Sequence, residues 1–379
     1  MTTVRTPTTA GLRRTFLKNS ALALVATAYP AINFAQTAAT AERTFSPVPG
    51  NWRSFEVTTR VDILKPQGVT KVWLPIPSVN TDWQRSQVNS FSSNGTARLE
   101  DDKDGARLLY VEFADTEAKP FIELTSAVQT QNRAQDWSHK GTVAAEDATE
   151  LKHWTQPTAM LPTDGLVRKT AQAATRGAKT DVKKAKKIYD WIVTNTYREP
   201  KVRGCGGGDI ASMLETGNLG GKCADLNALF VGLCRSVGLP ARDVYGLRVA
   251  PSAFGYRELG GNPTSLKGAQ HCRAEVYLTG YGWVAMDPAD VAKVMRQETP
   301  EWIKSAQNPL IAPVNKHLFG GWEGNWIGFN MGHDVVLPQS KGPALAFFMY
   351  PTAENASGRL DSYEPDQFKY QITATEIKA

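Results

Sequence analysis

Cysteine is scarce in this chain, where only four of 379 residues are Cys. Such a low content excludes a disulfide-rich scaffold, which is typically short and dense in cysteine. No two of the four have zinc-finger spacing or form a Cys-x-x-Cys motif, so we predict no structural metal and no cofactor. The four residues are Cys205, Cys223, Cys234 and Cys272.

Net charge is also low once the first segment is set aside. The formal charge of +6 at pH 7 includes four basic residues, and no acidic one, within residues 1–35. The rest of the chain nearly balances 39 basic against 37 acidic residues. Without a strong positive field, neither nucleic acid nor an anionic membrane surface is an expected partner.

No hydrophobic run reaches membrane-spanning length, so we expect no membrane span in the mature protein. Near the start, residues 11–18 read GLRRTFLK and precede a modest apolar stretch that ends near Ala35. The pair Arg13 and Arg14 resembles a twin-arginine signal, although Leu12 stands where Ser or Thr is more usual. The resemblance implies a signal peptide over residues 1–35 and export in folded form, by the twin-arginine machinery, to a bacterial periplasm or beyond.

Alternating apolar and polar residues mark the next part of the chain, residues 50–135. Phe55, Val57 and Val61 follow this period of two, and so do later residues up to Val128. A period of two is typical of strands that bury one face. We therefore predict a small β-sandwich over this region.

Composition and periodicity divide the rest of the chain. Polar, irregular residues 136–165 favour a linker, and an apolar stripe beyond them predicts a helix from about Asp181 to Thr196. Strands and helices mix through residues 166–340, which we assign as a second domain. Alternation returns in the tail, and we expect residues 341–379 to form a β extension that packs on the core. The predicted fold class is α+β.

Cys223 stands where a glycine-rich turn enters a strongly helical segment. Gly220 and Gly221 precede it, and the apolar stripe that follows predicts a buried helix ending near Gly238. A helix N-terminus exposes free N–H groups and a partial positive charge, both of which favour a thiolate. Cys234 lies instead on the apolar face, where a buried core thiol is the simpler interpretation. Cys223 is therefore the candidate nucleophile, and its own N–H is a candidate oxyanion donor.

His271 and Asp287 lie on two neighbouring predicted strands that a turn joins near Gly280. A two-residue loop there places the two side chains within about three positions of register. At that separation an aspartate can orient an imidazole that acts as general base. Directly before His271, residues 250–269 are rich in Gly, Pro and Ser, which predicts a flap over the cleft.

These residues occur in a pattern that resembles the core of the transglutaminase-like superfamily. The matching segments are GKCADLNALF at 221–230, RSVGLPAR at 235–242, HCRAE at 271–275 and WVAMDP at 283–288. The resemblance implies a papain-like catalytic domain over residues 166–340, with an N-terminal β-sandwich-like domain. It also implies a catalytic triad of Cys223, His271 and Asp287.

Other side chains near these motifs have open roles. The resembled family commonly carries Trp two residues after the histidine, where this chain has Arg273. Arg273 shares a strand face with Glu275, so it can either pair with that carboxylate or bind a carboxylate of the substrate. Asn218 is a candidate second oxyanion donor by proximity in the sequence alone. Cys205 and Cys272 can be free or bridged in an oxidising compartment.

The residues and the resemblance together predict a cysteine hydrolase, either a peptidase or an amidase. It would act on a peptide or protein substrate through a thioester acyl-enzyme. Acyl transfer to an amine is one alternative, because it differs only in what attacks the thioester. A non-catalytic peptide-binding module is another, although an intact triad argues against it.

Export can be tested at the paired arginines. Replacing both Arg13 and Arg14 by Lys removes the pair that the export machinery reads but keeps the charge. We expect the precursor to remain in the cytoplasm, as measured by cell fractionation and immunoblotting. Normal export of the Lys-Lys variant would contradict the assignment of the signal.

Overall fold

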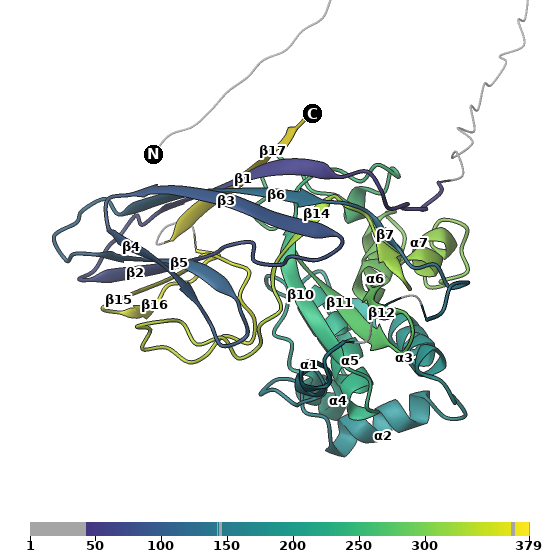
Figure 1. Ribbon diagram of the computed structural model, residues 1–379. Coiled ribbons are helices and arrows are strands. Elements are labelled where there is room, and N and C mark those ends of the chain that lie inside the picture. The colour runs from purple at the N-terminus through teal and green to yellow at the C-terminus, as the bar shows by residue number, and fades with distance from the viewer. Residues whose placement is uncertain (1–42, 142, 144–145, 365–367, 379) are drawn as a thin grey trace, which may run out of the picture. The chain divides into compact units, whose positions relative to one another are not determined.

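The structure of the protein is a computed structural model that describes residues 43–141, 143, 146–364 and 368–378. The predicted twin-arginine signal lies outside these described residues. Within them, residues from 43 onward belong to one compact unit. Figure 1 shows its two parts, a pair of stacked sheets and a smaller sheet flanked by helices.

Two antiparallel sheets form the β-rich part, as predicted for residues 50–135. The first has the order β17-β1-β6-β3, and the second has the order β16-β15-β2-β5-β4. Their strands are β1 (Arg53–Asp62), β3 (Gln84–Ser93), β6 (Phe121–Thr130), β17 (Lys369–Ile377), β2 (Thr70–Pro75), β4 (Thr96–Asp101), β5 (Arg107–Phe113), β15 (Thr352–Asn355) and β16 (Gly358–Arg359). Phe55, Val57 and Val61 are buried against side chains of the facing sheet, which confirms the alternation along β1.

Residues 341–379 contain three of the strands in the β-rich part. β17 runs antiparallel along β1, and β15 runs antiparallel along β2, so both sheets of the β-rich part are completed from the end of the chain. Met349, Leu360 and Ile372 of this segment lie in the same hydrophobic cluster as residues of α5 and β11. The Leu266 N–H donates to the Ile372 carbonyl at 2.8 Å, and Tyr350 and Tyr363 line a pocket of the helical part.

The helical part contains a four-stranded antiparallel sheet in the order β12-β11-β10-β14. Its strands are β10 (Ala241–Arg248), β11 (Gln270–Leu278), β12 (Gly282–Met286) and β14 (Trp326–Asn330). Helix α5 (Cys223–Ser236) packs against β11 and β10 and is buried along almost its whole length. It ends just before Gly238, whose φ of 82° is the left-handed conformation that terminates helices. Both features confirm the helix predicted from Cys223.

Shorter elements surround this sheet. The predicted helix at 181–196 is α3 (Asp181–Asn195), and the Thr180 hydroxyl caps it by accepting the Lys183 N–H. The other helices are α1 (Ala148–His153), α2 (Gly165–Ala174), α4 (Ile210–Thr216), α6 (Pro288–Gln297), α7 (Ala312–His317) and the 3₁₀ turn η1 (Arg257–Leu259). The remaining strands are β7 (Arg133–Ala134), β8 (Tyr197–Arg198), β9 (Gly220–Gly221) and β13 (Gly321–Trp322).

The β11–β12 hairpin differs by one residue from the prediction. Leu278 pairs with Gly282, so three residues form the loop instead of two. The reason is that Gly280 and Gly282 both have positive φ, at 85° and 74°, which lets the longer turn close. His271 consequently lies beyond the paired part of β12, opposite Gly246 of β10.

The predicted flap at residues 250–269 is a packed segment. Tyr256, Leu259 and Leu266 are buried in it, and the Tyr256 hydroxyl donates a hydrogen bond to the Leu310 carbonyl at 2.8 Å. Of this segment, only Gly268 lines the pocket that contains Cys223. Buried anchors of this kind indicate a brace beside the pocket and not a mobile flap.

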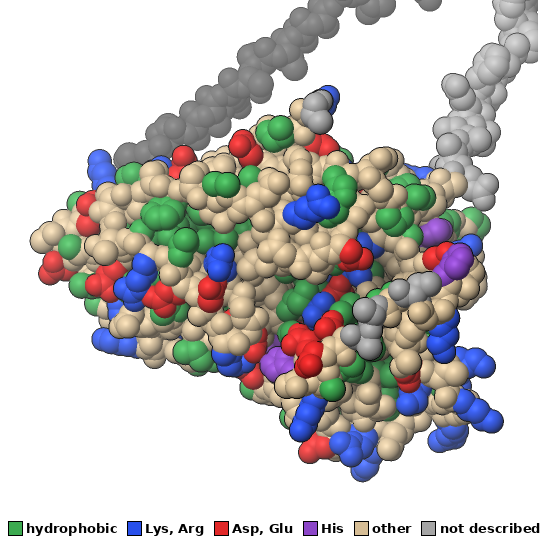
Figure 2. Space-filling model, viewed as in Figure 1, with side chains coloured by type: hydrophobic (Ala, Val, Ile, Leu, Met, Phe, Trp, Pro, Cys, Tyr) green, Lys and Arg blue, Asp and Glu red, His purple; other side chains and the backbone are tan. Residues whose placement is uncertain are grey.

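Basic side chains lie along the helices of the smaller part. Figure 2 shows Lys and Arg side chains (blue) along the lower right edge, where Figure 1 places α2 and α3. Lys183, Lys186 and Lys187 of α3 are exposed. None of the helices described is both long enough and apolar enough to cross a membrane.

The C-terminal strand β17 should contribute directly to stability. Ile372 is 2% exposed in the shared core of the two sheets, so Ile372→Ala removes buried methyl groups and leaves a cavity. We expect a loss of about 2–5 kcal/mol in the free energy of unfolding, measured by urea denaturation. Gln371→Ala, at an exposed neighbouring position, should change it by no more than about 0.5 kcal/mol. Equal effects of the two substitutions would contradict the packing of β17.

Candidate active site

Cys223 is the first residue of α5, at the position predicted for the nucleophile. Its side chain is 3% exposed, and the short strand β9 leads the chain into the helix directly before it. The first N–H groups of a helix have no intrahelical acceptor, so positive potential concentrates at this end. The local structure therefore favours a negative charge on the Cys223 sulfur.

The Asp225 carboxylate fixes the two glycine-rich loops around this helix terminus. It accepts hydrogen bonds from the N–H groups of Gly207 and Gly208, both at 2.9 Å, and from the N–H of Lys222 at 2.8 Å. The loop approaches so closely that a Cβ on Gly206 would lie 1.9 Å from an Asp225 oxygen. Only glycine fits there, which is the physical reason for the glycine-rich composition before Cys223.

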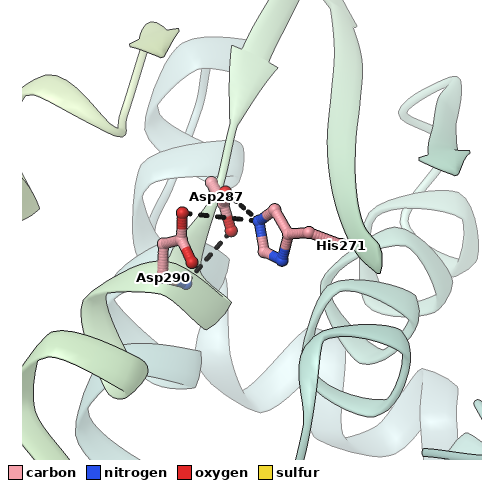
Figure 3. A group of neighbouring side chains, drawn as sticks. All are labelled: His271, Asp287 and Asp290. Carbon is pink, nitrogen blue, oxygen red and sulfur yellow. Dashed lines mark hydrogen bonds and ion pairs between the residues drawn. The ribbon is translucent and has the colours of Figure 1, made fainter. Parts of the chain in front are cut away.

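His271 and Asp287 meet beside Cys223. His271 lies near the start of β11, and Asp287 follows β12 as the N-cap of α6, where its side chain accepts the Asp290 N–H at 3.1 Å. The His271 Nε2 atom lies 2.8 Å from Asp287 Oδ2 and 3.4 Å from Asp290 Oδ2. Figure 3 shows that both carboxylates approach the same ring nitrogen and that the other ring nitrogen points away from them. Cys223 also forms a hydrogen bond with His271. The structure thus brings the three predicted residues together.

Charges around the pair favour a thiolate and an imidazolium. Burial would raise the pKa of the Cys223 thiol, but hydrogen bonds with Cys205, Cys272 and His271 hold this pKa well below its usual value. Burial and the Arg248 charge would lower the pKa of His271, but the two aspartates outweigh them and raise it to about 9. The lowered pKa favours the charged sulfur, which is the form that a nucleophilic cysteine requires.

A pocket of about 240 Å³ opens onto the Cys223 sulfur. Its lining combines His271 with side chains from α5, α6, β10 and the C-terminal segment. The charged and aromatic members are Arg198, Lys222, Arg248, Asp290, Lys293, Tyr350 and Tyr363. A larger hollow of about 800 Å³ contains neither Cys223 nor His271. Figure 2 looks onto this hollow, where acidic side chains (red) gather near the centre of the view.

Comparison with known proteins places the chain in a family. A model of the transglutaminase-like superfamily matches residues 168–288, which include Cys223, His271 and Asp287. An uncharacterized protein of Haemophilus influenzae is 33% identical over 345 residues, or 85% of this chain and 91% of that protein. The chain belongs to the transglutaminase-like superfamily.

A solved structure extends the likeness beyond the matched segment. The crystal structure of a candidate cysteine protease from Cytophaga hutchinsonii superposes with a TM-score of 0.54, at 15% identity. The match covers 88% of this chain and 94% of that one, so it includes most of the β-rich part. It confirms the predicted α+β fold of this transglutaminase-like protein.

The structure does not bring two predicted site residues into the pocket. Asn218 is exposed, and its side-chain oxygen accepts the N–H of Gly220 at 3.2 Å, so it stays within its own loop. Arg273 is buried and does not pair with Glu275, which instead bonds Arg133 and Arg242. Arg273 lies on the same face of β11 as His271 and, like His271, approaches the Asp287 carboxylate. The distance from Arg273 Nε to Asp287 Oδ2 is 3.5 Å.

Three functional neighbours were missed from the sequence. Asp290 lies beside the imidazole of His271 and forms an ion pair with Arg248. The Nη2 atom of Arg248 lies 2.5 Å from Asp290 Oδ1, and this positive charge keeps the carboxylate ionised. Burial would raise the pKa of Asp290, but the charges of Arg248 and His271 hold it well below its usual value. Asn227 donates from Nδ2 to Asp287 Oδ1 at 3.2 Å and thereby ties α5 to the aspartate. A polar residue on the apolar stripe of α5 was the signal that could have found Asn227.

Three of the four cysteines converge on one point. All four are free, so the structure has no Cys205–Cys272 bridge. Cys205 nevertheless lines the Cys223 pocket, accepts a hydrogen bond from the Tyr350 hydroxyl at 3.0 Å and interacts with both other sulfurs. Burial strongly raises the pKa of Cys234, which lies apart from this group as predicted.

The His271, Asp287 and Asp290 side chains also have the spacing of metal ligands, since their ligand atoms lie within 4.8 Å of one another. The donor set does not fit a divalent ion. Arg248 neutralises one carboxylate and Arg273 lies against the other, so a cation would meet two fixed positive charges. We assign both carboxylates to His271 and derive no step through a metal.

The interaction among the three clustered cysteines can be tested at Cys205, because the hydrogen bond from Cys205 lowers the pKa of Cys223. Cys205→Ala should therefore raise the Cys223 pKa and move the midpoint of iodoacetamide labelling to higher pH. The measurement is the labelling rate of Cys223 against pH, followed by mass spectrometry. Cys234→Ala, a buried thiol outside the group, should leave the midpoint unchanged. A midpoint that does not move in Cys205→Ala would contradict the coupling of the sulfurs.

Proposed function

We propose that this protein is an exported cysteine hydrolase, either a peptidase or an amidase, in which Cys223, His271 and Asp287 form a catalytic triad. One observation carries the proposal: a thiol with a strongly lowered pKa lies beside an imidazole that two buried carboxylates hold in its charged form. A thiolate and an imidazolium are the reactive states that acyl chemistry at sulfur requires.

The first half of the reaction follows from this pair. The Cys223 thiolate attacks the carbonyl carbon of a substrate amide, and the carbonyl oxygen becomes an oxyanion. The N–H of Cys223 at the start of α5 is the candidate donor to that oxyanion. His271 then gives its proton to the leaving amine as the C–N bond breaks, which leaves a thioester on Cys223.

The second half regenerates the enzyme. His271, now neutral, takes a proton from a water molecule that attacks the thioester, and the carboxylic acid product leaves with restoration of the thiolate. Asp287 holds the Nε2 side of the ring throughout, so the other nitrogen faces the sulfur and the attacking water. Asn227 and Arg273 position Asp287 and do not contact the reacting atoms.

Acyl transfer remains the second candidate, because an amine can attack the same thioester. Hydrolysis is favoured by the fold likeness to a candidate cysteine protease. A peptide or protein is the proposed substrate for both reactions. A bacterial periplasm, or the space beyond it, is the proposed location, since it follows from the twin-arginine signal.

Reactivity of Cys223 separates an enzyme from a peptide-binding module. Iodoacetamide at pH about 6.5, well below the free-thiol pKa of about 8.5, should label Cys223 before the other cysteines. His271→Ala should slow this labelling, because it removes the cationic partner. Asp287→Asn should keep the fold and impair turnover by misorienting the imidazole. Equally slow labelling of all four thiols in the wild type would exclude the catalytic assignment.

Product analysis separates hydrolysis from transfer. The protein is incubated with a peptide mixture in ¹⁸O-labelled water, with and without an added primary amine. Hydrolysis places ¹⁸O in a new carboxylate, and transfer places the amine on the acyl group; mass spectrometry distinguishes the two. Amine adducts as the main product would favour the transferase.

A further inference from the structure

The pocket that opens onto Cys223 is lined by more positive than negative charge. Four basic side chains line it, and Asp290 is the one acid among the lining residues. The four are Arg198, Lys222, Arg248 and Lys293. A cluster of cations is stable only where carboxylates or a bound ligand balance its charge. The ion-pair partners of each cation therefore show whether the pocket carries excess positive charge.

Two of the four are already balanced. Arg248 is almost fully buried and pairs with Asp290 at 2.5 Å. Lys293 Nζ lies 3.4 Å from a carboxylate oxygen of Glu258 and donates to its main-chain carbonyl at 2.7 Å. The charges of Arg248 and Lys293 are therefore matched within the protein, and these two side chains have a structural role in the pocket.

Arg198 and Lys222 have no such balance. Arg198 Nε donates to the neutral side-chain oxygen of Gln297 at 3.0 Å and makes no ion pair with any described residue. The Lys222 ammonium likewise has no ion-pair partner among the described residues. Asp225 is the nearby acid, but its oxygens are occupied by main-chain N–H groups.

The two cations also lie close enough to repel each other. Partial burial and then the Arg198 charge lower the pKa of Lys222. The charges of Cys205, Cys223 and Asp225 raise this pKa, but burial and Arg198 outweigh them. The start of α5 adds its own positive potential at the same place. Arg198 and Lys222 thus line the same pocket as the nucleophile, and neither has an ion-pair partner among the described residues.

We propose that Arg198 and Lys222 form a carboxylate subsite, so that the preferred substrate is an anionic peptide with a carboxylate next to the amide that Cys223 attacks. This inference rests on the proposed function. Arg198 offers a planar fork that suits a carboxylate, and Lys222 offers a point charge. The carboxylate can come from an acidic side chain or from the C-terminus of the peptide.

Two alkylating probes test the subsite without knowledge of the substrate. Iodoacetate and iodoacetamide transfer nearly the same group to sulfur, but only iodoacetate has a carboxylate. The ratio of their rates at Cys223, divided by the ratio for glutathione, measures selection for the anion. We expect this value to exceed one in the wild type and to fall about tenfold in the Arg198→Gln/Lys222→Gln double variant.

Control variants show whether the selection for iodoacetate depends on where the positive charge lies or only on the net charge of the protein. Lys183→Gln removes one positive charge from the exposed face of α3, outside the pocket, and should leave the ratio unchanged. Arg198→Lys keeps the charge and should retain most of the selection. The iodoacetamide rate of each variant reports whether Cys223 itself stays reactive and the protein folded. If the double variant does not fold, the single variant Arg198→Gln decides, with an expected partial fall in the ratio.

Peptides then identify the source of the carboxylate. Protection of Cys223 from iodoacetamide is compared between an amidated peptide with an acidic side chain and a neutral peptide with a free C-terminus. Protection by the first supports a side-chain carboxylate, and protection by the second supports a terminal one. Protection by neither would contradict the subsite.

The outcomes distinguish this inference from the proposed function. A fast iodoacetamide rate without preference for iodoacetate, or a preference that survives Arg198→Gln/Lys222→Gln, would overturn the subsite alone. Slow reaction with both reagents would overturn the thiolate nucleophile, and the subsite with it.

Discussion

The buried charges around His271 are the constraint on which the rest of the structure depends. Asp287, Asp290, Arg248 and Arg273 are all nearly inaccessible to water. Removing such charges from water costs several kcal/mol per ion unless each meets a partner at good geometry. They come from β10, β11, the end of β12 and the first turn of α6. Any arrangement of those four elements that separates the charges is therefore less stable.

The same arrangement sets the charges in the candidate active site. Burial of Asp287 and Asp290 would cost free energy if they had no charged partner. Beside His271 they raise its pKa to about 9 and so keep the imidazolium charged. That imidazolium, with the start of α5, stabilises the thiolate of Cys223. Helix α5 is in turn held to the aspartates by Asn227 and to the glycine-rich loops by Asp225. Stability and the proposed nucleophilicity of Cys223 thus depend on one set of contacts.

The β-rich part contributes to the site indirectly. Arg133, on β7 after the first sheet, bonds the buried Glu275 of β11, and Arg242 of β10 completes this ion pair from the other side. Tyr350 and Tyr363, beside strands that complete the sandwich, form one wall of the pocket. Both ends of the described chain therefore shape the site in its middle.

The amino-acid sequence by itself determined the local features: the alternation of β1, the helix that begins at Cys223, and the triad candidates. Short-range patterns suffice for these, because period and capping act within a few residues. Only the tertiary structure decided which polar groups meet. Asp290, Arg248 and Asn227 join His271 and Asp287 from separate elements. Arg273 faces Asp287, although its place on the strand predicted a pairing with Glu275 or with a carboxylate of the substrate. The pairing of β17 with β1 joins residues more than 300 positions apart, and no local pattern encodes such a contact.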